Sequence, residues 1–202
     1  MKKLLFVAAL LVGVAVLRAE TAAPLTAESQ CAFFKVRDRL MLANFQERKD
    51  LNHELMKELL RLGEAGDPRA AFTYAMSLQH DDYKKGHDMA GKQFPKLLAL
   101  AQKGDWIACD DLSRCFKYGI GCKEDEAAAD RWSEKSRELI KKAVENDDPA
   151  ALLEVAATAL MMGVPYTKKE VEDLLLRLKK HDSKFAEYVL EKAAEYKKRS
   201  GK

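Results

Sequence analysis

The sequence lacks several features that mark common protein classes. Five Pro and ten Gly in 202 residues exclude a collagen-like or low-complexity chain. β-Branched residues are sparse, and no stretch alternates between apolar and polar residues as a half-buried strand does. After residue 19 no apolar run reaches the roughly 20 residues that a membrane-spanning helix needs. We therefore expect a helical, soluble protein that is long enough to bury a core.

Sequence signatures of catalysis and cofactor binding are also missing. The chain has no Gly-x-Ser-x-Gly turn, no His-Glu-x-x-His and no phosphate-binding glycine loop. The lack of Cys-x-x-Cys argues against zinc binding and dithiol redox chemistry. Carboxylates are plentiful, but they alternate with Lys and Arg as solvated helix faces do. The sequence therefore predicts that the protein is not an enzyme and binds no metal or cofactor.

Two His-Asp clusters within residues 80–88 are the best candidates for a metal site. They read His80-Asp81-Asp82 and His87-Asp88, and the spacing matches no helical ligand pair. Lys84, Lys85 and Gly86 between them are typical of an exposed loop. We expect a solvated loop here and no bound metal.

The N-terminus has the organisation of a secretory signal peptide. Lys2 and Lys3 precede a 14-residue apolar run, Leu4–Leu17, and Ala19 supplies a small residue for cleavage. The alternative is a retained membrane anchor, but 14 apolar residues are short for a span. We predict a cleaved signal peptide over 1–19 and a periplasmic or secreted mature protein.

The charge balance argues against nucleic acid as a partner. The whole chain carries 35 Lys and Arg against 32 Asp and Glu. Cleavage after residue 19 removes three of the basic residues and leaves a formal net charge of zero. General phosphate binding requires a positive field, which the mature chain lacks.

From Glu28 onward the pattern predicts helices almost throughout. Apolar residues recur at spacings of three and four, and Gly, Pro and Asp cluster at the breaks between these stretches. A four-residue pattern also recurs. It reads Asp67-Pro68-Arg69-Ala70, Asp105-Trp106-Ile107-Ala108, Asp148-Pro149-Ala150-Ala151 and, more weakly, Ser183-Lys184-Phe185-Ala186. Each supplies an N-cap residue and then a small Ala, at offsets of 38, 43 and 35 residues. Such periods in a helical chain indicate stacked helix pairs.

The second unit, from Gly104 to Trp132, resembles the Sel-one-like repeat, a relative of the tetratricopeptide repeat. The matching positions are Gly104, Ala108, Leu112, Gly119, Gly121, Asp125, Ala129 and Trp132. The unit departs from the family pattern at Ser113, Phe116 and Cys122. The resemblance covers roughly residues 64–200 and implies an all-α fold, an α/α solenoid of three or four helix pairs. We therefore expect a signal peptide at 1–19, an N-terminal capping helix within 20–63 and the solenoid over 64–202.

The four cysteines suggest two disulfides in an exported chain. Cys109 and Cys115 are about 9 Å apart along one predicted helix, which is too far for a bond. The glycine turn after the helix can bring Cys122 back to Cys115, so we favour Cys115–Cys122 and, by remainder, Cys31–Cys109. The alternative is that all four are small apolar core residues without disulfides.

Candidate partner-binding residues follow from the resemblance, because the first helices of such solenoids line the concave surface. Trp106, just after a helix cap, is the candidate hot spot, whereas Trp132 occupies a packing position and is expected in the core. The polar side of the first helices adds Arg69, Asp110, Asp111, Arg114 and Lys117. For any single one of these, an ordinary solvated face is the alternative interpretation.

These observations favour an exported adaptor or scaffold that binds another protein through its concave face. Three alternatives stay open. They are an immunity protein against a secreted antibacterial effector, an exported hydrolase or β-lactamase-like enzyme, and a structural spacer that binds peptidoglycan.

Overall fold

The computed structural model describes residues 25–162 and 166–200, and within these ranges it contains ten helices and no strand. The helices are α1 (Ala27–Phe45), α2 (Lys49–Glu64), α3 (Pro68–Leu78), α4 (Tyr83–Gly91), α5 (Phe94–Gln102), α6 (Trp106–Tyr118), α7 (Glu126–Glu145), α8 (Pro149–Met162), α9 (Lys168–Lys179) and α10 (Lys184–Ser200). The prediction of an all-α protein is confirmed. The predicted signal peptide, 1–19, lies outside the described residues.

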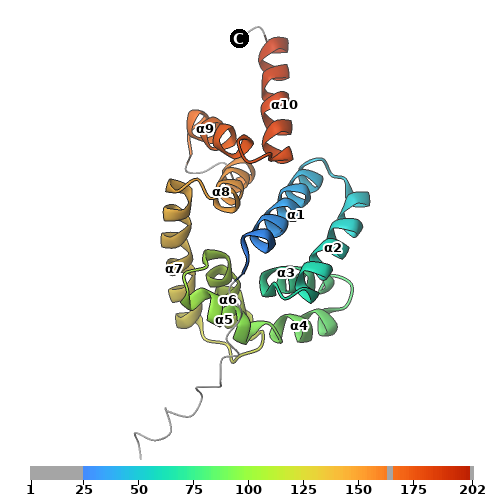
Figure 1. Ribbon diagram of the computed structural model, residues 1–202, viewed down its shortest axis with the longest axis vertical. Coiled ribbons are helices and arrows are strands. Elements are labelled where there is room, and N and C mark those ends of the chain that lie inside the picture. The colour runs from blue at the N-terminus through green and yellow to red at the C-terminus, as the bar shows by residue number, and fades with distance from the viewer. Residues whose placement is uncertain (1–24, 163–165, 201–202) are drawn as a thin grey trace, which may run out of the picture.

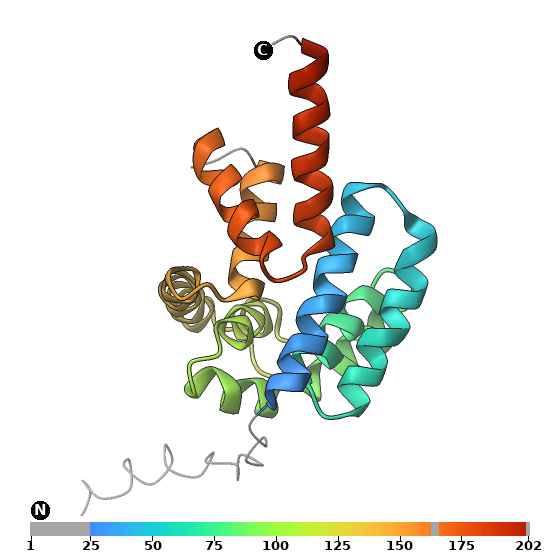
Figure 2. The same ribbon diagram turned by 45° about the horizontal axis from the view of Figure 1, so that its top comes forward.

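Most helices that follow one another along the chain pack together, and the most extensive packing joins α6 to α7. Figure 1 shows α2 to α8 following one another around α1. In the turned view of Figure 2, α2 lies beside α1 and the first turn of α10 meets α1. No helix in the described part of the chain is both long and apolar enough to cross a membrane.

The four-residue pattern found in the sequence begins four helices in the same way. At the start of α3, α6, α8 and α10, the first residue of the pattern is the N-cap. Its side chain accepts a hydrogen bond from a backbone N–H of the first helical turn. The Ala of each pattern is fully buried, as seen for Ala70, Ala108, Ala151 and Ala186. The residue before each cap has a positive φ, as seen for Gly66, Gly104, Asp147 and Asp182. One local geometry therefore recurs at all four positions.

The α1 helix differs from the expected N-terminal cap. A cap would cover one end of the array, whereas α1 contacts α2, which follows it directly, and also α8 and α10 from the C-terminal part of the chain. Its buried side chains include the neighbours Phe33 and Phe34, which face different sides of the helix. Phe33 joins a core with α2 and α3, and Phe34 joins a core with α8, α9 and α10. A helix that is apolar on several sides is a central element, which explains the difference.

The segment 80–88 was predicted to be a solvated loop, but most of it belongs to the helix α4. Asp82 caps this helix by accepting a hydrogen bond from Lys85 N at 3.0 Å. A Cβ at Gly86 would lie 2.6 Å from the carbonyl oxygen of Ala75, so the glycine allows α4 to approach α3 closely. The residues that suggested a loop therefore serve helix capping and helix packing.

The glycine turn between α6 and α7 has the predicted form. Gly119 and Gly121 have φ of 65° and 73°, the region that favours glycine. A Cβ at Gly121 would come within 2.5 Å of the carbonyl oxygen of Gly91. Asp125 then caps α7 by accepting from Ala128 N at 2.9 Å. The turn packs so tightly that only glycine fits at position 121.

Asp38 ties α1 to the N-terminus of α10. Its carboxylate accepts hydrogen bonds from the Ser183 hydroxyl and from Lys184 N, the latter at 2.8 Å. The Asp38 side chain is buried, and this burial raises its pKa even though the hydrogen bonds oppose the shift. The carboxylate thus satisfies helix N–H groups that lie 146 residues further along the chain.

We expect Asp38→Ala to lower the free energy of unfolding by about 3 kcal/mol, because it leaves Ser183 and the first N–H groups of α10 buried without an acceptor. Urea unfolding followed by circular dichroism measures this change. The matched control is Asp88→Ala, which removes an exposed ion pair with Lys84 and should change stability by less than about 0.5 kcal/mol. Equal effects of the two substitutions would contradict the anchoring role of Asp38.

Candidate functional site

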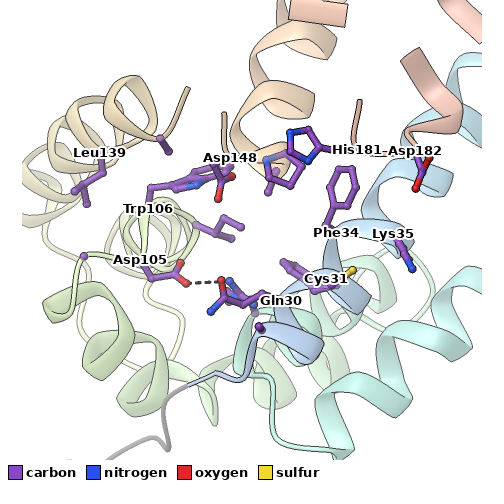
Figure 3. A pocket seen from close by; sticks show the side chains of 18 of the residues that line it. Gln30, Cys31, Phe34, Lys35, Asp105, Trp106, Leu139, Asp148, His181 and Asp182 are labelled. Atoms are coloured by element: carbon purple, nitrogen blue, oxygen red, sulfur yellow. Dashed lines mark hydrogen bonds and ion pairs between the residues drawn. The ribbon is translucent and has the colours of Figure 1, made fainter. Parts of the chain in front are cut away.

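A deep hollow lies between α1 and the N-terminal ends of α6 and α8. It has a volume of about 730 Å³, and we call it the inner pocket. In Figure 3, Gln30, Cys31 and Phe34 of α1 face Trp106, Asp148 and His181 across it. Leu139 of α7 and two further residues of the turn before α10, Lys180 and Asp182, also line it. The pocket therefore gathers residues from four regions that are distant in the sequence.

Trp106 is half-buried at the start of α6 and lines the inner pocket. The guanidinium carbon of Arg37 lies 5.8 Å from the centre of its ring. Its backbone carbonyl accepts a hydrogen bond from the Ser136 hydroxyl on α7 at 2.9 Å. The backbone of Trp106 is thus held by α7, and part of its indole faces the pocket beside Arg37.

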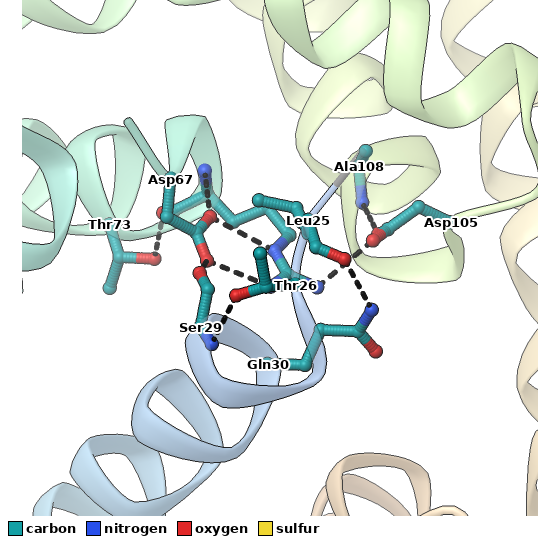
Figure 4. Close-up of polar contacts among 9 residues, drawn as sticks. Leu25, Thr26, Ser29, Gln30, Asp67, Thr73, Asp105 and Ala108 are labelled. Atoms are coloured by element: carbon teal, nitrogen blue, oxygen red, sulfur yellow. Dashed lines mark hydrogen bonds and ion pairs between the residues drawn. The ribbon is translucent and has the colours of Figure 1, made fainter. Parts of the chain in front are cut away.

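Arg69 does not belong to an accessible surface, contrary to its place in the sequence prediction. Its guanidinium donates to Asp67 Oδ2 at 2.8 Å and to Asp105 Oδ2 at 2.9 Å, and its side chain is buried. The ring of Phe33 lies 4.8 Å below the guanidinium carbon. Ser29 donates to Asp67 as well, and Figure 4 shows how these groups join α1 to α3 and α6. Arg69 is buried because its guanidinium pairs with the carboxylates of the two helix caps, Asp67 and Asp105. Its role is therefore to stabilise the fold.

Asp111 is the second predicted surface residue that the structure buries. Its Oδ2 has no hydrogen-bond partner, and its other oxygen lies 3.9 Å from the Arg114 guanidinium. Burial raises the pKa of this carboxyl to about 8, because the charged form loses its hydration. Asp111 points inward because it lies four residues after Ile107 and four before Cys115, both of which are in the core.

The other candidates remain accessible but lie outside the inner pocket. Asp110 accepts a hydrogen bond from Arg114 at 2.7 Å, and both side chains are about half exposed. Lys117 is exposed one turn further along α6, and none of the three lines the pocket. Of the six predicted partner-binding residues, the pocket therefore holds Trp106 and the buried Arg69.

Sequence reasoning missed the contribution of α1 and of the turn before α10. Gln30, Cys31 and Lys35 line the pocket from α1, and His181 and Asp182 do so from the turn. The only available signal was the adjacent pair Phe33 and Phe34, since two large apolar neighbours cannot both face one side of a helix. That signal predicts a central α1 but does not say which loops meet it.

All four cysteines are free in the structure, and none of them lie at disulfide distance from each other. Cys31 is exposed in the inner pocket while Cys109 is buried in the core around α5 and α6, so α1 does not bring this predicted pair together. The glycine turn does return Cys122 to α6, as expected. Its thiol, however, donates to the Cys115 carbonyl oxygen at 3.4 Å, so the sulfur meets the backbone of α6.

Two carboxylates around the pocket, those of Asp105 and Asp148, serve as helix caps. Asp105 accepts from Ala108 N at 2.8 Å in addition to its bond with Arg69, and Asp148 accepts from Ala151 N at 2.8 Å. Within residues 25–162 and 166–200, no group of three His, Cys, Asp or Glu side chains is arranged to hold a metal ion. The lining thus combines apolar side chains with polar groups, a mixed surface that suits binding of another molecule.

No model of a known protein family matches the chain, and no solved structure matches it. The resemblance to the Sel-one-like repeat therefore stays a prediction that rests on the residues between Gly104 and Trp132. The function has to be argued from the pocket itself.

We expect Asp111→Asn to gain stability relative to the native protein as the pH rises from 5 to 8. With a pKa near 8, Asp111 keeps its proton in the folded state while the unfolded chain loses it above about pH 4. The folded state then binds one more proton, and its free energy of unfolding falls by up to about 1.4 kcal/mol per pH unit. The free energy of unfolding of Asp111→Asn lacks this pH dependence, because asparagine does not titrate.

Urea unfolding at pH 5, 6, 7 and 8 measures the effect, with the half-exposed Asp110→Asn as the control. Parallel curves for the native protein and Asp111→Asn would contradict the burial of this carboxyl.

The thiols should react in a fixed order with Ellman's reagent. Cys31 is exposed, so we expect it to react first, and Cys31→Ser should abolish the fast phase. Burial raises the pKa of Cys109 to about 11 and that of Cys115 further still, so both should react only after unfolding. In denaturant without reductant, four thiols per chain agree with the structure. Two or none would instead support the predicted disulfides.

Proposed function

We propose that the protein is an exported, non-enzymatic module that binds a segment of another protein in the inner pocket. The observation that carries this proposal is the half-buried indole of Trp106, which lies beside Arg37 in an open hollow of about 730 Å³. Tryptophan with one apolar face accessible is the residue type most enriched at interaction hot spots. An adaptor or scaffold role follows from such a surface.

The four helices that begin alike support the interpretation as a short solenoid of helix pairs, as the Sel-one-like resemblance implies. In this interpretation α3, α6, α8 and α10 are the first helices, and α1 occupies part of the surface that their N-termini line. The inner pocket is then the part of that surface which α1 leaves open. The basic N-terminal residues and the 14-residue apolar run at 4–17 support export.

A photo-crosslinking amino acid placed in the pocket tests the proposal in the protein's own host. We choose Cys31 and Lys180, which line the pocket, and Lys84 on α4, whose side chain is 89% exposed, as the control position. Light should link positions 31 and 180 to one and the same protein, identified by mass spectrometry. Position 84 should give no such adduct.

Substitution of the anchor completes the test. Trp106→Ala should weaken the adducts at positions 31 and 180 at least tenfold, because it removes the apolar contact. Trp132→Phe is the matched control, since Trp132 packs against the core around α5 and α6 and does not line the pocket. Circular dichroism verifies that both variants fold. Adducts of equal yield at all three positions, or adducts insensitive to Trp106→Ala, would refute the proposal.

A further inference from the structure

A second hollow, of about 550 Å³, lies on the other side of α1, between α1, α2 and the start of α10. We call it the outer pocket. Phe34, Lys35 and Asp182 line both the inner and the outer pocket, so the two adjoin along α1. A chain that leaves the inner pocket past Lys35 therefore enters the outer one.

The base of the outer pocket is apolar. Phe34 and Val36 of α1 are buried beneath it, and the partly buried Ala32 and Leu62 line it from α1 and α2. This surface can receive one large apolar side chain of a ligand. In the inner pocket, Trp106 plays the corresponding part as an apolar contact surface.

The rim of the outer pocket carries an excess of cations. Among its acidic groups, Glu58 accepts two hydrogen bonds from Arg39 at 2.8 and 2.9 Å, and Asp38 is occupied by the N-terminus of α10. Lys35 and Arg61 are exposed and form no ion pair within the described part of the chain. Asp182 is the one acidic group at the rim without such a bond, so positive charge dominates.

We propose that the outer pocket selects an acidic segment of the partner protein. A large apolar side chain enters between α1 and α2, and a neighbouring Asp or Glu of the segment pairs with Lys35 or Arg61. This inference rests on the proposed function, because it assigns a chemistry to the partner that the inner pocket anchors. Charge complementarity around an apolar anchor sets both the selectivity and the association rate of such a complex.

Peptide selection on the purified full chain tests the inference. A phage library of random 12-residue peptides is panned on the protein, and selected sequences are synthesised with a fluorescent label for anisotropy measurements. Selected peptides should carry Asp or Glu within four residues of Leu, Phe, Met or Trp. Their affinity should fall as salt rises, because the contacts are ionic at an exposed rim.

Charge reversal localises the contact. Lys35→Glu combined with Arg61→Glu should weaken binding of the selected peptide at least tenfold. Lys84→Glu combined with Lys92→Glu changes the net charge equally at two exposed positions, on α4 and at its C-cap, and should change affinity less than twofold. A peptide with its acidic residues replaced by Lys should bind the reversed variant better than the native protein.

The outcomes separate this inference from the proposed function. If the selected peptides lack acidic residues, lose affinity with Trp106→Ala and ignore the Lys35/Arg61 reversal, the acidic selectivity is wrong while the inner pocket stands. If the library yields no peptide that depends on either pocket, both proposals fall. Binding that the reversal weakens and the Lys-containing peptide restores establishes the outer pocket as an acidic-segment site.

Discussion

The fold depends on one constraint, which is that helix N-termini buried against α1 need acceptors for their N–H groups. Asp67 and Asp105 cap α3 and α6, and the guanidinium of Arg69 lies between their carboxylates. Asp38, on α1 itself, performs this task for α10. A buried charge is tolerated only when its partners are complete, so these groups fix where α1 lies relative to the helices around it.

The position of α1 in turn creates both pockets. Phe33 and Phe34 enter separate cores on two sides of α1, and the pockets adjoin at Phe34 and the exposed Lys35 beside it. Trp106 projects from the cap of α6 toward α1, and the turn before α10 forms the opposite edge. The proposed binding surface is therefore built from the same elements that hold the fold together, so a ligand would meet a prearranged surface.

What the sequence could predict was local. The caps at Asp67, Asp105, Asp148 and Ser183 and the glycine turn depend on residues within a few positions, so their form followed from the pattern. The burial of Arg69 and Asp111 could not be predicted in this way, because it depends on contacts between helices that are distant in the sequence. The helix α4 was missed since its charged, glycine-containing segment has weak helix propensity and is stabilised by packing on α3.

Native-state hydrogen exchange of the α1 amides tests most directly whether α1 is the central element. If α1 is held on several sides, the amides of residues 33–43 exchange only through global unfolding, with the same free energy as those of α6. If α1 is instead a terminal cap, its amides exchange through local opening at a clearly lower free energy than those of α6. That result would contradict the central role of α1 and, with it, the origin of both pockets.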